Sequence, residues 1–264
     1  MEGELRHGLR EFGGASRDSD VVLEVASRTD RGVSARANAF ALRADSSGPS
    51  LLRRLNGISS AIWCTAATPI PDDFRVRGAS RRVYRYFDPL PSQSAERRGA
   101  AARLFSGEVD VRSLGRGLPL DRPVWRTIES VRVRATREGS VVEVRAPSFV
   151  WGMVRKIVAA LREADAGRLS PEQLADALAG RTRLTLPMAE PEPLVLWDVE
   201  YPLRWQFTWT GPTRHQSIRW ARNYAALRAR RRVLDAILPG RAAAGRRRLS
   251  RPAPSARASG PNSA

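Results

Sequence analysis

Hydrophobic positions along this 264-residue chain alternate between the two-residue period of a β-strand and the spacing of a helix. Strand-like alternation covers residues 21–25, 37–42, 61–68, 82–87, 127–135, 141–146 and 194–201. Helical spacing occurs near the start, through Leu5, Leu9 and Phe12, and again over residues 51–58, 149–164 and 218–238. Because strands keep alternating with helices, the pattern predicts an α+β protein with helices packed on one face of its sheets and two halves that meet across a cleft.

Two of the predicted helices carry additional marks. The helix over residues 149–164 has an apolar stripe formed by Phe149, Met153, Ile157, Ala160 and Leu161. A second helix should begin at Ser170-Pro-Glu-Gln173, which places serine at the cap, proline at the first helical position and glutamine at the third. This is the arrangement of a capping box.

The composition divides the chain into four expected segments. These are an N-terminal half over residues 1–88, a C-terminal half over 89–207, a basic helical extension over 208–238 and a tail over 239–264. The tail consists of alanine, arginine, serine, proline and glycine without hydrophobic periodicity, so we expect it to be disordered.

The charge balance points to a polyanionic partner and puts nucleic acid first. The formal net charge is +18, and 12 of these charges lie between Arg214 and the C-terminus. Lys156 is the only lysine, so nearly all basic residues are arginine. Arginine binds phosphate with two parallel hydrogen bonds, but codon usage in a GC-rich genome produces the same replacement of lysine. The charge alone therefore leaves both explanations open.

Several classes of protein are excluded by the composition. A single cysteine, Cys64, rules out a disulfide framework, and with only His7 and His215 it leaves no cluster of zinc ligands. No apolar run approaches the roughly 20 residues that span a bilayer, and the acidic start does not resemble a signal peptide. We expect a cytoplasmic protein without a metal and without membrane attachment.

Asp30 is the first candidate for chemistry. It follows a hydrophobic strand in a short loop, between Arg28 and Arg31 and before Gly32. A neighbouring guanidinium favours the charged form of a carboxylate, which would make Asp30 a standing nucleophile. The alternative is a turn aspartate that bonds its own backbone while the arginines face solvent.

A strand over residues 82–87 would place Arg82, Tyr84 and Tyr86 on one face. An aromatic ring beside arginines can stack on a base whose phosphates the arginines hold, although sheet packing explains tyrosine in a strand equally well. Arg155 lies within the otherwise apolar helix of residues 149–164. It either reaches the solvent edge of the apolar stripe or pairs with a carboxylate, and Asp30 across a cleft would be such a partner.

Taken together, these segments resemble the TruA family of tRNA pseudouridine synthases, from the first helix to about Arg204. The matching motifs occur in the order typical of the family: Arg28-Thr-Asp-Arg-Gly-Val-Ser-Ala35, Leu55-Asn56, Pro71-Asp-Asp-Phe-Arg75, Arg82-Val-Tyr-Arg-Tyr86, Phe149-Val-Trp-Gly-Met-Val-Arg-Lys-Ile-Val158, Leu169-Ser-Pro-Glu172 and Leu194-Val-Leu-Trp-Asp-Val-Glu-Tyr201. Ser34, where many bacterial members have histidine, is more similar to the archaeal branch.

The resemblance implies the pseudouridine synthase fold, with mainly antiparallel sheets around an RNA-binding cleft, and a role for each candidate residue. The roles are the nucleophile for Asp30, its ion-pair partner for Arg155, the aromatic that stacks on the uracil for Tyr84, displacement of the base for Arg28 and an apolar wall for Leu194. Arg82, beside Tyr84, is the expected further contact to the substrate.

The resemblance further implies conversion of uridine to pseudouridine in the anticodon arm of tRNA, at tRNA positions 38 to 40, by a homodimer that needs no cofactor. Two departures from the family are expected to matter. Ser27 replaces the usual glycine, and the chain begins at the first helix without the strand and the Asp-Gly loop that normally precede it. A truncated, non-catalytic tRNA-binding or RNA-binding protein is therefore the alternative.

Overall fold

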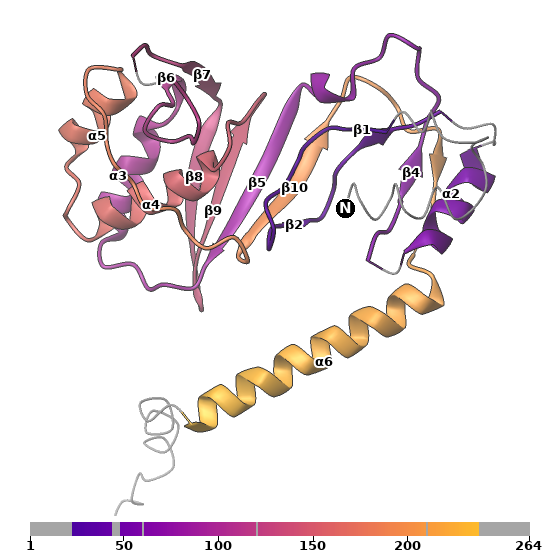
Figure 1. The fold of residues 1–264 in the computed structure, drawn as a ribbon. Helices are drawn as coiled ribbons and strands as arrows, with labels where there is room; N and C mark the ends of the chain where they lie inside the picture. Colours follow the sequence, from indigo (N-terminus) through magenta and orange to yellow (C-terminus); the bar gives the residue numbers. More distant parts are fainter. Residues whose placement is uncertain (1–22, 44–47, 60, 120, 210, 238–264) are drawn as a thin grey trace, which may run out of the picture.

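Five strands form the central sheet of the protein (Figure 1). The computed structural model describes residues 23–43, 48–59, 61–119, 121–209 and 211–237. The strand order is β2 (Ser34–Ala35), β10 (Leu194–Glu200), β5 (Arg81–Asp88), β9 (Gly139–Ala146) and β8 (Ser130–Thr136). Only β2 and β10 run parallel, and the other neighbours in this sheet are antiparallel. The expected α+β class is confirmed.

Three helices cover one face of this sheet: α3 (Ala95–Leu104), α4 (Met153–Asp165) and α5 (Pro171–Leu178) (Figure 1). Along β5, Tyr84 and Tyr86 point into the core beneath α4, whereas Arg85 lies on the opposite face. The alternation expected for residues 82–87 is therefore correct. The same parity places Val142 and Val144 of β9 in the core beside these tyrosines.

The remaining elements complete the fold. They are β1 (Glu24–Val25), β3 (Phe40–Ala41), α2 (Gly48–Ile58), β4 (Ala66–Ala67), the 3-10 helix η1 (Val76–Gly78), β6 (Gly107–Asp110), β7 (Trp125–Ile128), β11 (Phe207–Thr208) and the long helix α6 (Arg214–Ile237). They form three two-stranded antiparallel sheets, β1 with β3, β4 with β11 and β6 with β7. No described helix is long and apolar enough to cross a membrane.

The single strand expected over residues 127–135 is wrong. The chain forms β7 up to Ile128 and then β8 from Ser130, and the two strands belong to different sheets. Ile128 and Val131 are both buried although they lie three positions apart, which a period of two cannot place on one face. This odd spacing between two buried residues shows that one strand ends and another begins between them.

The strand expected over residues 61–68 is also mostly wrong, because only Ala66 and Ala67 pair with β11. At Cys64, before β4, the backbone bonds the side chain of Asn56 where a strand would bond its neighbour. The side-chain oxygen of Asn56 accepts from Cys64 N at 2.8 Å and the side-chain amide donates to Cys64 O at 2.9 Å. A buried backbone whose polar groups are satisfied by a side chain needs no sheet.

The other expected elements differ in how well they are recovered. The capping box at Ser170 and Gln173 is confirmed, with both reciprocal hydrogen bonds present. Helix α3 was not expected, because its sequence of alanine and arginine has little apolar periodicity. The helix through Leu5, Leu9 and Phe12 and the tail over 239–264 lie outside the described residues.

A buried ion-pair cluster fastens α3 and α4 to the end of β5. The carboxylate of Asp88 accepts hydrogen bonds from Arg98 of α3 and, at 3.0 Å, from Nη2 of Arg162 in α4. Only 1% of the Arg98 side chain is exposed and none of the Asp88 side chain. Burial by itself would raise the pKa of Asp88, but the hydrogen bonds from Arg162 and Arg98 outweigh burial and hold the pKa below its usual range.

Replacing Asp88 by alanine should lower the free energy of unfolding by about 3–5 kcal/mol, because Arg98 would remain charged in the core without its partner. Urea denaturation at neutral pH measures this loss. The control is Asp176→Ala, which removes an exposed pair with Arg181 and should cost less than about 1 kcal/mol.

The difference in stability between the wild type and Asp88→Ala should also depend on pH. A carboxyl with a depressed folded pKa contributes stability above its unfolded pKa, and this contribution is lost as the pH falls through the folded pKa. The difference between the wild type and Asp88→Ala should therefore shrink below about pH 4. A difference that stays constant from neutral to strongly acidic pH would contradict this role of Asp88.

Candidate active site

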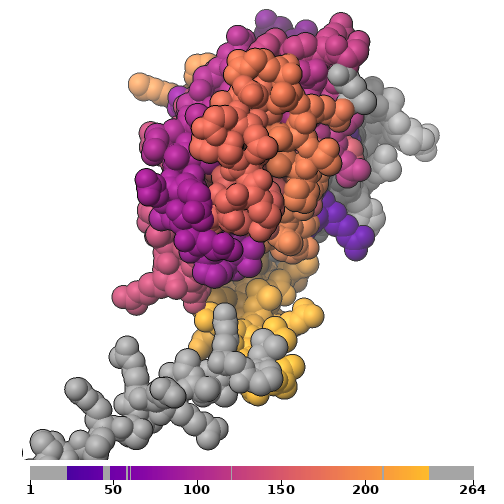
Figure 2. Space-filling model, turned by 90° about the vertical axis from the view of Figure 1, so that its left-hand side faces the viewer, coloured from indigo at the N-terminus to yellow at the C-terminus, as the bar shows by residue number. Residues whose placement is uncertain are grey.

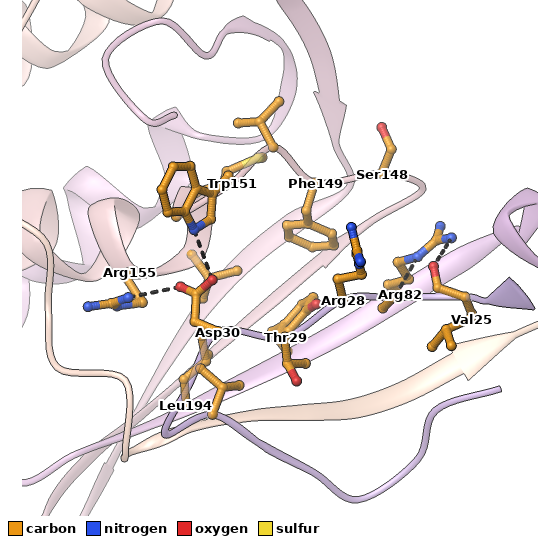
Figure 3. Close-up of a pocket in the computed structure, with 18 of the residues that line it drawn as sticks. Val25, Arg28, Thr29, Asp30, Arg82, Ser148, Phe149, Trp151, Arg155 and Leu194 are labelled. Carbon is orange, nitrogen blue, oxygen red and sulfur yellow. Dashed lines mark hydrogen bonds and ion pairs between the residues drawn. The ribbon is translucent and has the colours of Figure 1, made fainter. Parts of the chain in front are cut away.

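A pocket of about 580 Å³ opens where the N-terminal loop meets the start of α4 (Figure 3). Its lining comes from residues 25–30 and Val33, from Arg77, Arg82 and Tyr84, and from residues 147–155 and Leu194. A volume of this size is typical of small-ligand sites. Segments more than 100 positions apart in the sequence therefore form one site.

The carboxylate of Asp30 lies in this pocket with a donor on each oxygen (Figure 3). Trp151 Nε1 donates to Oδ1 and Arg155 Nη1 donates to Oδ2, both at 2.9 Å. The side chain keeps 27% of its surface exposed, so the pocket side of the carboxylate stays accessible. Asp30 is therefore no mere turn residue, although its carbonyl also accepts the turn hydrogen bond from Val33 N.

Arg155 reaches Asp30 from the first turn of α4 and is itself held in place. Its Nε donates to Ala189 O at 2.6 Å, and Ala189 N donates back to Arg155 O at 3.3 Å. Only 15% of the Arg155 side chain is exposed. The pairing with Asp30 that the sequence left open is thus the one that the fold adopts.

Trp151 is placed by the turn that precedes α4. The helix expected from residue 149 begins only at Met153, so Phe149 is not part of its stripe, and this part of the expectation is wrong. Gly152 has φ +79°, the left-handed region that favours glycine, and this turns Trp151 out of the helical path toward Asp30. The guanidinium of Arg116 lies 4.6 Å from the centre of the Trp151 ring.

Tyr84 forms an aromatic wall of the pocket. Its ring meets Phe149 edge-on at a centroid distance of 4.8 Å, and the side chain is buried. Burial raises the pKa of Tyr84 to about 12, so its phenol stays neutral near neutral pH. Tyr86, two residues along the strand, is fully buried and donates from its hydroxyl to Glu190. Sheet packing therefore explains Tyr86, while Tyr84 borders the pocket.

The remaining expected residues also line the pocket. Arg28 is exposed and Leu194 is buried at the wall formed by β10. Arg82 is buried and uses its guanidinium inside the protein, where it donates to Ser27 Oγ and to the carbonyl oxygens of Ala26, Arg77 and Pro147. Ser27, which departs from the glycine expected at this position, is thus one of the groups that orient Arg82.

The sequence reasoning missed the part that Trp151 and Phe149 take in the site. Both were assigned to the helix or to its apolar stripe, because aromatic residues with helical spacing usually pack in a core. The available indication was Gly152, which stands directly before the helix and after two aromatic residues. Among the described residues, no group of histidine, cysteine, aspartate and glutamate could hold a metal ion.

Known proteins are similar to this chain over most of its length. A family model described as tRNA pseudouridine synthase matches residues 101–202. A protein of Pyrococcus furiosus named tRNA pseudouridine synthase A is 34% identical over 205 residues, which cover 76% of this chain and 74% of the relative. The chain belongs to the tRNA pseudouridine synthase family. The resemblance drawn from the sequence motifs is confirmed.

Further relatives of this family are also archaeal. The protein of the same name from Thermococcus kodakarensis is 36% identical over 205 residues, with 76% of both chains covered. That of Methanocorpusculum labreanum is 34% identical over 247 residues, which are 90% of this chain and 84% of the relative. The archaeal character expected from Ser34 is consistent with these relatives.

Substituting Gly152 by alanine should lower the free energy of unfolding by about 1–2 kcal/mol, because φ is +79° there. The added methyl would also meet Met188 Cε at 2.6 Å. This flexible end can move, but the turn that carries Trp151 would shift with it. We expect an altered indole N–H resonance of Trp151 by NMR, together with the loss of stability in urea.

The matched control is Gly117→Ala, where φ is +68° and nothing lies within 4 Å of the added methyl. It should lose similar stability and leave the Trp151 resonance unchanged. A Gly152→Ala protein with wild-type stability and spectrum would show that the left-handed turn does not position Trp151.

Proposed function

We propose that the protein converts uridine in tRNA to pseudouridine, with Asp30 as the nucleophile. The observation that carries this proposal is the Asp30 carboxylate in a pocket, bonded on one oxygen by Arg155 and on the other by Trp151. Membership of the tRNA pseudouridine synthase family supports it. The two halves of the pocket come from residues 1–88 and 89–207, which we propose as the two halves of the enzyme.

The reaction is an isomerisation whose atoms balance without a cofactor. The bond between N1 of the base and C1′ of the ribose breaks, and a bond between C5 and C1′ forms. N1 gains a proton and C5 loses one. The Asp30 carboxylate bonds to C1′ as the bond from C1′ to N1 breaks, and after the uracil turns, this ester bond breaks as C5 bonds to C1′, which divides one difficult step into two. A tightly walled pocket keeps the detached base in place and excludes water.

The surrounding residues have separate parts in this proposal. Arg155 balances the charge of Asp30 and fixes its direction through their hydrogen bond. Tyr84 stacks on the uracil and Leu194 closes the apolar wall of the pocket. Arg28, exposed at the rim, takes the space that the base leaves when it turns out of the helix.

We assign Arg82 to positioning the pocket loop and not to contact with the substrate. All the acceptors of its guanidinium named above belong to the protein, and they tie the Asp30 loop to β5 and to residue 147. A guanidinium so engaged holds backbone segments in a fixed relation.

The target uridine must leave the base stack, because atoms of its ring and sugar cannot reach a side chain inside a duplex. A loop or a stem end costs less to open than an intact helix. This supports the anticodon stem-loop, at tRNA positions 38 to 40, as the substrate region. The same substrate class supports the cytoplasm as the site of action.

Asp30→Asn should lower the initial rate of pseudouridine formation by at least about a thousandfold, because an amide cannot serve as the nucleophile. Tritium release from tRNA labelled at uridine C5 measures the rate, since that hydrogen is lost in the reaction. Binding of tRNA should stay within about threefold of wild type, because the surface that contacts phosphates is unchanged.

The control is Asp121→Asn, an exposed aspartate outside the pocket, which should leave the rate unchanged. If the wild-type protein binds tRNA and releases no tritium, the chain is the non-catalytic RNA-binding alternative. If Asp30→Asn is as fast as wild type, the nucleophile is another group.

We propose a homodimer, and one sheet face supports it. Opposite the helices, Trp197 lies under the guanidinium of Arg85 at 3.9 Å and near the exposed ring of Phe87. The helices α3, α4 and α5 lie on the other face of the sheet (Figure 1). An aromatic cluster rimmed by arginine is typical of protein interfaces.

Sedimentation should give twice the 29.2 kDa mass of one chain. The variant Phe87→Glu should shift the mass to that of one chain, because it buries a charge at the interface. A wild-type protein that sediments as a monomer at micromolar concentration would contradict the dimer.

A further inference from the structure

Helix α6 lies outside the segment that the family model matches and contributes nothing to the pocket. Its start is well defined. Thr213 N donates to Gln216 Oε1 at 2.9 Å and Gln216 N donates to Thr213 Oγ1 at 3.3 Å, which is a reciprocal cap. With 24 residues, the helix is about 36 Å long. In Figures 1 and 2 it lies below the rest of the molecule.

One side of α6 contacts the body near both ends of the helix, through a buried contact at its start and an exposed ion pair near its end. Near its start, the buried amide of Gln216 donates to Ile62 O at 2.6 Å, and the Trp220 ring lies 5.7 Å from that of Trp63. Near its end, Arg231 Nη2 donates to Glu138 Oε1 at 3.1 Å in the turn between β8 and β9. Positions 216, 220 and 231 lie on one side of a helix, so this side faces the body.

The arginines of α6 flank that side in two rows. The helix contains seven arginines and a single acidic residue, Asp235. Helical spacing puts Arg214, Arg228 and Arg232 on one flank and Arg219, Arg222 and Arg230 on the other. All six are exposed. Because the body-facing contacts fix the rotation of the helix, both rows point to solvent.

We propose that α6 is an RNA-binding arm, on which the two arginine rows hold backbone phosphates of the tRNA outside the pocket. The proposal rests on tRNA as the substrate of the proposed function. Arginine pairs with phosphate oxygens through two parallel hydrogen bonds, and such contacts fix the position of a nucleic acid without reading its sequence. The buried amide of Gln216 and the contact between Trp220 and Trp63 give the start of the arm a set direction relative to the body.

A second copy of the chain fits α6 less well. Tyr224 and Leu227 lie near the body-facing side and are each 65% exposed, which would suit an apolar contact. Two such helices would, however, bring their arginine rows together, and like charges at close range oppose association. A lipid surface fits less well too, because helical spacing spreads the exposed apolar side chains of α6, among them Ile218, Leu227 and Val233, around the helix and leaves no single apolar face to enter a membrane.

The test variant combines Arg222→Gln, Arg230→Gln and Arg232→Gln in α6. The matched control combines Arg103→Gln in α3, Arg122→Gln in the loop before β7 and Arg126→Gln in β7, all exposed and none of them in α6. Both variants remove three positive charges, so the net charge of the protein falls equally. Glutamine keeps the helix propensity of arginine, and circular dichroism checks that α6 persists.

The measurement is the Kd for unmodified tRNA over a series of salt concentrations. Each phosphate contact contributes about 0.7 to 0.9 to the slope of log Kd against log salt. We expect the α6 variant to lose about 2 to 3 from this slope and to bind roughly tenfold more weakly at physiological salt. The slope of the control variant should fall by less than about 1. The rate at saturating tRNA should be unchanged in both.

The two proposals fail in different ways. If the protein forms no pseudouridine and the α6 variant still loses slope, the proposed function is wrong and the RNA-binding arm stands. If the enzyme is active and the α6 variant matches the control in slope and Kd, the arm is wrong. A changed sedimentation mass or loss of binding to acidic vesicles, with tRNA affinity intact, would instead identify α6 as an interface between copies or a lipid contact.

Discussion

The hydrogen bonds between the Asp30 carboxylate and two residues at the start of α4 hold the site together. They join a loop of the N-terminal segment to a helix 125 positions further along the chain. Each oxygen has its own donor, a cation from Arg155 and a neutral indole from Trp151. Two donors fix both the distance and the rotation of the carboxylate, which a single ion pair would leave free. The geometry of the pocket depends on that fixed direction.

Arginine serves this protein in two distinct ways. Inside the fold, the guanidiniums of Arg82 and Arg98 are buried, and they satisfy carbonyl or carboxylate oxygens from separate elements. A planar fork with several donors can do this, whereas a lysine would offer one compact charge. On α6 the seven arginines are all exposed, which suits them to the proposed contacts with phosphate. Codon usage does not account for Arg82 and Arg98, because their hydrogen bonds use the planar, several-donor geometry of the guanidinium group.

The single lysine, Lys156, also serves inside the fold, where it holds a loop beside the pocket. Lys156 follows Arg155 in α4 and donates to Ser113 O and Gly115 O at 3.3 and 3.1 Å. These contacts hold the loop whose Arg116 lies over the ring of Trp151. Burial lowers the pKa of Lys156, and the nearby positive charges of Arg183 and Arg116 lower it further. The support of Asp30, the proposed nucleophile, thus extends through Trp151 to a loop outside the proposed reaction.

The sequence by itself determined the class of the fold, the strands β5 and β9, the capping box at Ser170 and the identity of Asp30, Tyr84 and Arg155 as candidates. Local period, cap chemistry and short motifs are properties of neighbouring residues, so a linear reading can recover them. It could not shorten the strand expected over residues 61–68 to the two residues of β4, because Asn56 binds the backbone of Cys64 through contacts made only in the folded chain. Nor could it place Trp151 on Asp30 or α6 against the turn before β9. Those contacts depend on the direction of a left-handed turn at Gly152 and on packing between distant segments, and the tertiary structure alone decides them.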